Sequence, residues 1–425
     1  MSIVKDDKQY LWHPFTQMKT APSPLPIVKG QGAYLYSEEG KSYLDGIASW
    51  WTNLHGHSHP YIAQAIYEQS LQLEHVLFAD CTHPSATTLA KRLLALLPKK
   101  FSKVFYSDNG STAVECALKM AFQYWFNLDP NTKKKKVICF TGSYHGDTFG
   151  AMSASGKNDF NKPFWSHLFP VAMLDVPTPQ TEEKILKEFL LLIERDDVAC
   201  FLFEPLVLGA GGMRMYCPLA LDKLITLCKK HNVLTIADEV MTGFGRTGSL
   251  FACEYLTSLP DIICLSKGIT GGFLPLAATV CTEEIFHAFL GDTLHQALLH
   301  GHSYTANPLA CTSALASLDL LLDPSCLLQR TMIAHNHAMF CQKWQNHPKL
   351  VRCESLGTIL ALEYKVDDSS YFSRLRDQLY LFFLSKGILL RPLGNVLYVL
   401  PPYCITSDEL HRIYHYISHT LEGLS

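Results

Sequence analysis

Val233-Leu234-Thr235-Ile236-Ala237-Asp238-Glu239-Val240 is the stretch that decides the fold class of this 425-residue chain. An uninterrupted apolar run of strand length ends there in two carboxylates. Pro260–Gly268 (PDIICLSKG) has the same form, and its apolar run is followed by Lys267. Apolar runs without polar alternation are typical of strands buried on both faces, as in parallel sheets covered by helices. We therefore expect an α/β fold with both segments in one sheet.

Similar apolar runs recur from about Leu54 to Asp323 and alternate with amphipathic stretches of helical length. The clearest of them are Lys103–Ser107, Val137–Phe140 and Cys200–Phe203. Strands that alternate with helices form parallel sheets, so residues 54–323 are predicted to form a large, mostly parallel-sheet domain.

Strand-like segments also occur near both ends of the chain. They are Ala33–Tyr36, Ser42–Asp45 and Val396–Leu400, and helix-like segments accompany the last of them. We expect residues 1–53 and 324–425 to combine into a smaller α+β domain.

The composition excludes several classes of protein. Hydrophobic residues make up 48% of the chain and charged residues 18%, which is too apolar for intrinsic disorder. Lys and Arg number 36 against 39 Asp and Glu, so no excess of positive charge favours nucleic acid as a partner. The polar start Met1–Lys8 and the lack of any apolar run near ~18 residues predict a cytoplasmic protein without a membrane span. The fourteen cysteines contain no CxxC pair, so we expect reduced, mostly buried thiols.

A candidate anion site lies where an apolar run passes through a polar turn into a helix. The helix is predicted from apolar positions 113, 114, 117, 118 and 121, and Gly110 and Ser111 fall in its first turn. Free backbone N–H groups and the positive end of the helix dipole favour a phosphate there. Taken alone, the segment is also compatible with an ordinary helix N-cap.

Asp238 and Lys267 are 29 residues apart, which is enough for one connection back into the same sheet. Ligands bind at the carboxyl ends of such strands. Burial lowers the pKa of a lysine and frees its amine to attack a carbonyl. An acid, a buried amine and a phosphate-binding helix start together indicate pyridoxal 5′-phosphate: the lysine forms a Schiff base with its aldehyde, and the aspartate pairs with the ring nitrogen.

With these residues in place, the chain resembles the class III, fold-type I pyridoxal phosphate-dependent aminotransferases. The resemblance extends over nearly the whole chain. Its segments are Leu11–Met18, Ser49–Trp51, Gly142–Ser153, Gly209–Tyr216, Ala237–Gly248, Leu265–Gly272, His300–Tyr304 and Arg391–Gly394.

The resemblance implies roles for individual residues around the cofactor. Gly110 and Ser111 are implied to bind its phosphate, and Tyr144 is implied to stack on its ring and to help form the substrate pocket. The family is dimeric, and the loop His300–Ser303 is implied to reach the partner's cofactor. Ser303 is implied to bond its phosphate, His302 to contact the cofactor and Gly301 to contact the substrate. Trp50 is implied to line the keto-substrate tunnel, and Arg391 to pair with a distal carboxylate, which suits the planar guanidinium.

Within class III, the segments most resemble the branch that aminates 8-amino-7-oxononanoate to 7,8-diaminononanoate in biotin biosynthesis. S-adenosylmethionine is the donor in the well-known members, which carry a substrate-binding Tyr where this chain has Phe15, and Gly-Pro-Thr where it has Gly301-His302-Ser303. Some members with Phe use lysine as donor. The expected partners are thus a small-molecule donor and a keto-acid acceptor, and the donor stays open between S-adenosylmethionine and lysine.

Other interpretations compete with this one. Ornithine, acetylornithine and 4-aminobutyrate aminotransferases belong to the same class, and a non-catalytic binding protein of the same fold is a more distant alternative. Gly243–Gly248 matches GxGxxG, but carboxylates precede the glycines and no strong helix follows, which argues against a dinucleotide site. His55, His57 and His59 lack an accompanying ligand cluster, so we expect no metal.

Overall fold

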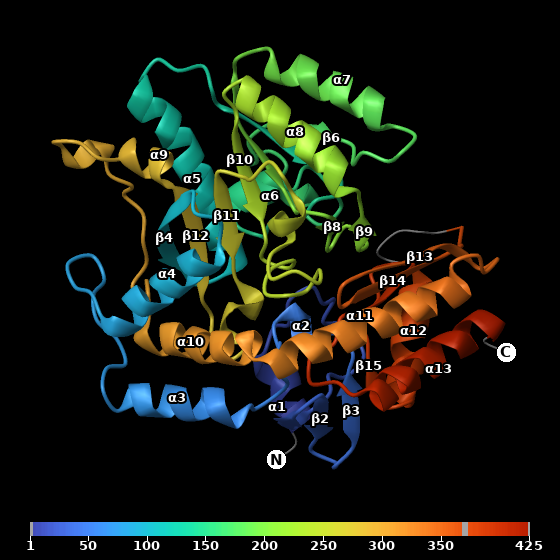
Figure 1. Ribbon diagram of the computed structural model, residues 1–425. Coiled ribbons are helices and arrows are strands. Elements are labelled where there is room, and N and C mark those ends of the chain that lie inside the picture. Colours follow the sequence, from blue (N-terminus) through green and yellow to red (C-terminus); the bar gives the residue numbers. More distant parts are fainter. Residues whose placement is uncertain (1–2, 368–372, 424–425) are drawn as a thin grey trace.

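The centre of the molecule is a seven-stranded sheet, seen in a computed structural model that describes residues 3–367 and 373–423 (Figure 1). Its strands, in spatial order, are β4 (Phe101–Ser107), β12 (Ala277–Thr282), β11 (Ile262–Leu265), β10 (Leu234–Asp238), β7 (Val198–Phe203), β5 (Lys136–Phe140) and β6 (Val171–Leu174). β12 pairs antiparallel with β4 and β11, and the other neighbours pair in parallel. The mostly parallel α/β sheet expected from the sequence is confirmed.

Helices cover both faces of this sheet because its central strands are apolar on both sides. Along β7, Cys200 and Leu202 pack on one face, and Phe201 and Phe203 on the other. The first face is covered by α5 (Gly110–Leu128), α6 (Phe149–Ala154) and α9 (Glu283–His287), and the second by α4 (Pro84–Leu96), α7 (Glu182–Ile193), α8 (Pro218–Lys230) and α10 (Pro308–Leu322). Each fully buried phenylalanine contributes about 2 kcal/mol through burial.

The two ends of the chain come together below the sheet, where the blue N-terminal and the orange-red C-terminal parts lie side by side (Figure 1). A four-stranded sheet is shared between them, in the order β1 (Ile27–Gln31), β2 (Tyr34–Ser37), β3 (Ser42–Asp45) and β15 (Ile388–Leu389). A three-stranded sheet contains β13 (Leu350–Leu356), β14 (Ile359–Tyr364) and β16 (Val396–Val399). The smaller α+β part built from both termini is therefore present, while its limits at residues 53 and 324 stay a prediction.

The remaining elements connect these layers. They are the helices α1 (Ile3–Tyr10), α2 (Ala48–Trp51), α3 (Pro60–Ser70), α11 (Pro324–Trp344), α12 (Arg374–Ser385) and α13 (Ser407–Gly423), the two-stranded ribbon of β8 (Val207–Leu208) and β9 (Arg214–Met215), and the 3₁₀ turns Lys162–Phe164, Ala252–Tyr255, Lys267–Thr270 and Leu294–Gln296. In the described ranges, no single helix is long and apolar enough to cross a membrane, and α10 with α11 passes such a test only as a pair bent by 69°.

The strands predicted from the sequence agree with the structure to within two residues, with one difference in burial. Lys103–Ser107 was expected to be buried on both faces, but β4 lies at the edge of the sheet and is partly exposed. β12 was not predicted from the sequence, although Thr279, Val280 and Thr282 are β-branched residues that favour strands. All fourteen cysteines are free, and eleven of them are buried.

Candidate active site

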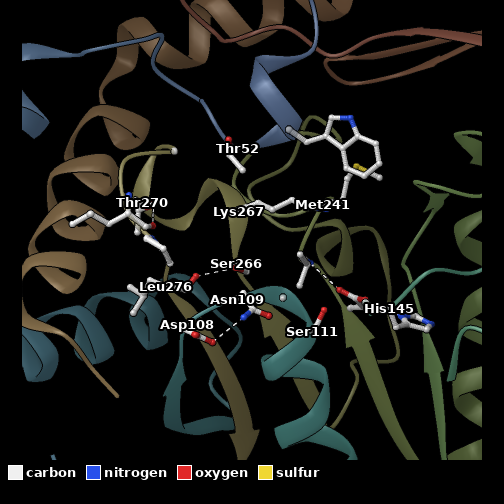
Figure 2. A pocket seen from close by; sticks show the side chains of 18 of the residues that line it. Thr52, Asp108, Asn109, Ser111, His145, Met241, Ser266, Lys267, Thr270 and Leu276 are labelled. Atoms are coloured by element: carbon white, nitrogen blue, oxygen red, sulfur yellow. Dashed lines mark hydrogen bonds and ion pairs between the residues drawn. The ribbon is translucent and has the colours of Figure 1, made fainter. Parts of the chain in front are cut away.

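A pocket of about 530 Å³ opens at the carboxyl ends of β10 and β11. Figure 2 shows side chains from separate elements converging on it, among them Lys267, Ser111 and His145. Its lining includes Trp51, Thr52, Asp108, Asn109, Gly110, Ser111, Tyr144, His145, Gly146, Glu204, Asp238, Val240, Met241, Ser266, Lys267 and Thr270. Five residues singled out in the sequence thus lie around one cavity: Gly110, Ser111, Tyr144, Asp238 and Lys267.

Lys267 follows β11 directly and begins a 3₁₀ turn. Its side chain lines the pocket, and Nζ lies 4.4 Å from the centre of the Trp51 ring. Burial lowers the pKa of Lys267 to about 8, although the carboxylates of Asp238 and Glu204 oppose this shift. At pH 7 about one tenth of the amine is therefore neutral, far more than for an exposed lysine, and the neutral form is the one that reacts with carbonyl groups.

Asp238 is the last residue of β10 and is buried. Its Oδ2 lies 2.7 Å from Nδ1 of His145, and its Oδ1 accepts a hydrogen bond from the backbone N–H of Val240 at 3.1 Å. His145 is also buried, and its Nε2 has no partner in the described part of the chain. The carboxylate is thus held rigidly at the pocket wall and can pair with a cationic ring nitrogen.

The first turn of α5 forms another part of the pocket wall. Asn109 caps the helix by accepting the N–H of Thr112 at 3.1 Å, and the Thr112 hydroxyl accepts the N–H of Asn109. Gly110 packs against Val240, and a Cβ added there would lie 2.7 Å from a methyl carbon of that valine. The lack of a side chain at Gly110 therefore lets Val240 pack closely against this turn. The backbone N–H groups in the first turn of a helix have no intrahelical partner and can bind an anion.

Tyr144 is positioned by a buried acid that the sequence interpretation did not single out. Glu204 follows β7, and its two carboxylate oxygens accept the backbone N–H groups of Tyr144 at 2.9 Å and Gly209 at 2.8 Å. Burial raises the pKa of Glu204 to about 7. The Tyr144 hydroxyl donates to Asp147 at 2.9 Å, and burial raises the pKa of Tyr144.

Phe15, Trp50 and Arg391 form a second cluster, which we call the tryptophan cluster. The guanidinium carbon of Arg391 lies 4.7 Å from the centre of the Trp50 ring. Phe15 meets Trp50 edge to face at 5.7 Å between ring centres, and it also contacts Phe160. In the described ranges Arg391 has no ion-pair partner, so its donors are available to a carboxylate.

The loop Gly301-His302-Ser303 does not border this pocket in the described chain. Gly301 and Ser303 are exposed, and His302 accepts the N–H of Tyr304 through Nδ1. The structure contains one copy of the chain, so the expected contact with a partner's cofactor stays a prediction.

Among the pocket-lining residues that sequence reasoning did not single out are Trp51, His145 and Glu204. For Glu204 a signal existed, because it follows the predicted strand Cys200–Phe203 just as Asp238 ends its own. Trp51 borders the pocket where the neighbouring Trp50 had been selected, and His145 borders it together with the selected Tyr144. The conformation of the turn decides which of two adjacent tryptophans borders the cavity. Glu239, in contrast, is a structural acid that accepts the N–H groups of Ala252 and Cys253.

The competing motifs have other roles in the fold. Residues 243–248 form turns, and no helix begins at Gly248. His57 pairs with Asp45 at 2.8 Å, and His55 bonds Ser317. Across residues 3–367 and 373–423, no group of three or more His, Cys, Asp or Glu side chains is arranged to hold a metal.

Comparison with known proteins identifies the family. The model of "Aminotransferase class-III" matches residues 15–421. A relative from Synechococcus elongatus, named adenosylmethionine-8-amino-7-oxononanoate aminotransferase, is 48% identical over 98% of this chain and 99% of its own. A relative of the same name from Helicobacter pylori is 38% identical over 96% of this chain and 94% of its own.

Solved structures agree with this result. The adenosylmethionine-8-amino-7-oxononanoate aminotransferase of Methanocaldococcus jannaschii superimposes with a TM-score of 0.92, at 37% identity over 98% of both chains. An amine transaminase from an uncultivated Pseudomonas species, in a PLP-bound form, superimposes with a TM-score of 0.88, at 29% identity over 97% of this chain and 98% of its own. Because the family model spans almost the entire sequence and the same fold is found at these identities, this chain belongs to the class III aminotransferases.

Proposed function

We propose that this chain is the pyridoxal phosphate-dependent aminotransferase that converts 8-amino-7-oxononanoate to 7,8-diaminononanoate in biotin biosynthesis. The observation that carries this proposal is the pocket in which a buried lysine amine, a buried aspartate and a helix N-terminus converge. The names of relatives up to 48% identical supply the acceptor and suggest S-adenosylmethionine as the donor.

The residues present fit this cofactor. Lys267 offers a buried amine for its aldehyde, Asp238 a carboxylate for its ring nitrogen, and the N–H groups at Gly110 and Ser111 an anion site for its phosphate. Tyr144 offers an aromatic face for its ring. When bound, pyridoxal phosphate supplies a conjugated ring that accepts the electron pair released at a substrate carbon.

The chain's own residues then divide the remaining tasks. When it is not bonded to the cofactor, the Nζ of Lys267 would be the base that accepts the proton from the substrate carbon. Asp238 is fixed between His145 and the N–H of Val240, and its carboxylate would keep the ring nitrogen of the cofactor protonated. Glu204 keeps Tyr144 in place through its backbone N–H.

At the acceptor end, Arg391 binds the distal carboxylate of the keto acid through its planar guanidinium. Trp50 supports that guanidinium on its ring face and lines the path of the acyl chain. Phe15 lies next to Trp50 and brings no hydroxyl, so a donor that relies on a hydrogen bond at this position binds more weakly. S-adenosylmethionine and lysine are the two donors to be compared.

The active unit in this proposal is a cytoplasmic homodimer with sites shared across the interface. Gly301, His302 and Ser303 lie away from their own pocket, and a partner's loop supplies the Ser303 hydroxyl to the phosphate. The exposed apolar side chains of Leu11 and Trp12, 59% and 89% accessible, support the packing of a further chain on this protein.

The test combines loading with separate half-reactions. Purified protein is incubated with pyridoxal phosphate, and the visible-violet band of the bound cofactor is followed as S-adenosylmethionine, lysine, ornithine, 4-aminobutyrate or glutamate is added. Loss of the band with S-adenosylmethionine or lysine, and its return with 8-amino-7-oxononanoate, is the expected result. Loss only with ornithine or 4-aminobutyrate would assign the chain to a sister aminotransferase, and protein that stays colourless would refute the cofactor.

A further inference from the structure

The turn that carries both tryptophans has an unusual backbone. Ala48, Ser49 and Trp51 have φ values of 49°, 60° and 68°, although none of them is glycine. Ser49 and Trp50 also depart from helical geometry inside α2. Residues with side chains avoid this left-handed region unless the surroundings impose it, and such strain is concentrated at functional sites.

Asp45 holds the backbone of this strained turn from its N-terminal side. It ends β3 and is fully buried, with an exposed fraction of 0%. Its Oδ1 accepts the N–H of Ile47 at 3.1 Å, and its Oδ2 accepts the N–H of Ser49 at 2.6 Å. His57 approaches the same Oδ2 with Nε2 at 2.8 Å. One carboxylate therefore satisfies two N–H groups of the strained turn and is fixed by a third group.

The two tryptophans depend on this turn to different degrees. Trp51 has anchors of its own, because its indole N–H donates to Tyr398 at 3.0 Å and Arg246 donates to its carbonyl at 3.3 Å. Trp50 is 40% exposed, and in the described part of the chain ring contacts alone hold its indole. The placement of Trp50 therefore rests on the backbone that Asp45 holds.

The register of the four-stranded sheet brings Arg391 close to the turn that carries Trp50. β3 pairs in parallel with β15, with Asp45 opposite Leu389, so the chain leaves both strands at one edge. Arg391 follows two residues later, and its guanidinium lies over the Trp50 ring. A shift of the turn changes the support beneath the guanidinium without a change in Arg391 itself.

We propose that Asp45, fixed by His57, is a positioning residue that holds the turn of residues 46–51 and thereby sets the Trp50–Arg391 pair that binds the carboxylate of the keto acid. The role rests on the proposed function, because it assigns that carboxylate to Arg391. Neither Asp45 nor His57 lines the pocket in the described chain, so both act through the tryptophan turn.

Asp45→Asn is the direct test. In this variant an NH₂ group replaces Oδ2 and faces the N–H of Ser49. Because the N–H of Ser49 loses its hydrogen-bond acceptor, the turn relaxes. The KM of the keto acid is expected to rise roughly tenfold, while kcat at saturating keto acid and the rate of the donor half-reaction change less than about twofold. An unchanged KM in folded, cofactor-loaded Asp45→Asn protein would overturn the proposal.

Asp261→Asn is the matched control, because Asp261 also accepts a backbone N–H, that of Thr235 at 2.9 Å, but lies away from the tryptophan turn. It is expected to lower Tm and to leave the KM of the keto acid unchanged. If both variants raised this KM equally, the effect would be general destabilisation and the proposal would be wrong.

Gly30→Ala keeps the test decisive if Asp45→Asn does not fold. A Cβ at Gly30 would lie 2.6 Å from the Cβ of His57, so this variant displaces the histidine and leaves the carboxylate intact. A smaller rise of the same KM is expected, and no rise would contradict the role of His57. If the wild type rejects 8-amino-7-oxononanoate, the proposed function fails, and the same KM comparison is made with the keto acid that the wild type does accept.

Discussion

The strand-edge pocket and the tryptophan cluster differ in the kind of backbone that positions their side chains. In the pocket, Asp238 and Lys267 are set by the ends of two neighbouring parallel strands, and Gly110 by the start of a capped helix. In the tryptophan cluster, Phe15, Trp50 and Arg391 come from loops and a strained turn. Regular elements thus fix the groups proposed to hold the cofactor, whereas irregular segments from both chain ends shape the region proposed to recognise the substrate.

This difference predicts that changes in the pocket abolish chemistry, whereas changes in the tryptophan cluster alter affinity. Lys267→Ala is expected to have the largest effect, a loss of turnover of at least about 10³-fold, because both the amine that holds the cofactor and the proton acceptor are removed. Steady-state rates and the visible spectrum measure this loss. Lys100→Ala serves as the control and should leave turnover unchanged. Burial also lowers the pKa of Lys100, but this lysine lies outside the pocket. Normal multiple-turnover activity of Lys267→Ala would break the comparison.

The pH dependence of cofactor loading sharpens the same point. Burial lowers the pKa of Lys267 to about 8, so the reactive neutral amine is the minor form below that pH and the major form above it. The rate of covalent loading of cofactor-free protein should increase about tenfold per pH unit below pH 8 and level off above it. Stopped-flow absorbance measures this rate. A rate that still climbs steeply up to about pH 10, the range of an exposed lysine, would contradict the assignment.

In the tryptophan cluster, Arg391→Ala is expected to raise the KM of the keto acid by roughly 10- to 100-fold, because the carboxylate loses a charged hydrogen-bond partner. The donor half-reaction should keep its rate, which single-turnover measurements with S-adenosylmethionine or lysine would establish. Arg195→Ala is the matched control, because Arg195 is an exposed arginine distant in sequence from Arg391, and it should leave this KM unchanged. An unchanged KM would remove Arg391 from the acceptor site.

Phe15→Tyr should have the smallest effect and tests the donor. The ring is 49% exposed and packs against Trp50, so a hydroxyl can be added without burying it unpaired. One neutral hydrogen bond contributes about 1 kcal/mol, so the KM of S-adenosylmethionine should fall by about fivefold while that of lysine stays the same. Phe126→Tyr, at another exposed phenylalanine, should change neither value.

Both the fold and the pocket were largely predictable because they follow from local patterns. The apolar runs predicted β5, β7, β10 and β11, and the polar turn before position 110 predicted the start of α5. β12 was missed although Thr279, Val280 and Thr282 favour a strand, and its antiparallel pairing with β4 and β11 was decided only by the tertiary structure. Glu204 could have been found by the strand-end rule that found Asp238.

What the sequence determined by itself is the order of strands, helices and strand-end side chains, because hydrophobic periodicity and helix capping act between residues close in the chain. Only the tertiary structure decided which of two adjacent residues faces the cavity, and which distant groups meet. His145 reaches Asp238 across 93 positions, and Trp51 reaches Tyr398 across 347. Such contacts depend on sheet order, strand register and backbone strain, which arise only when the whole chain packs and which no local pattern specifies.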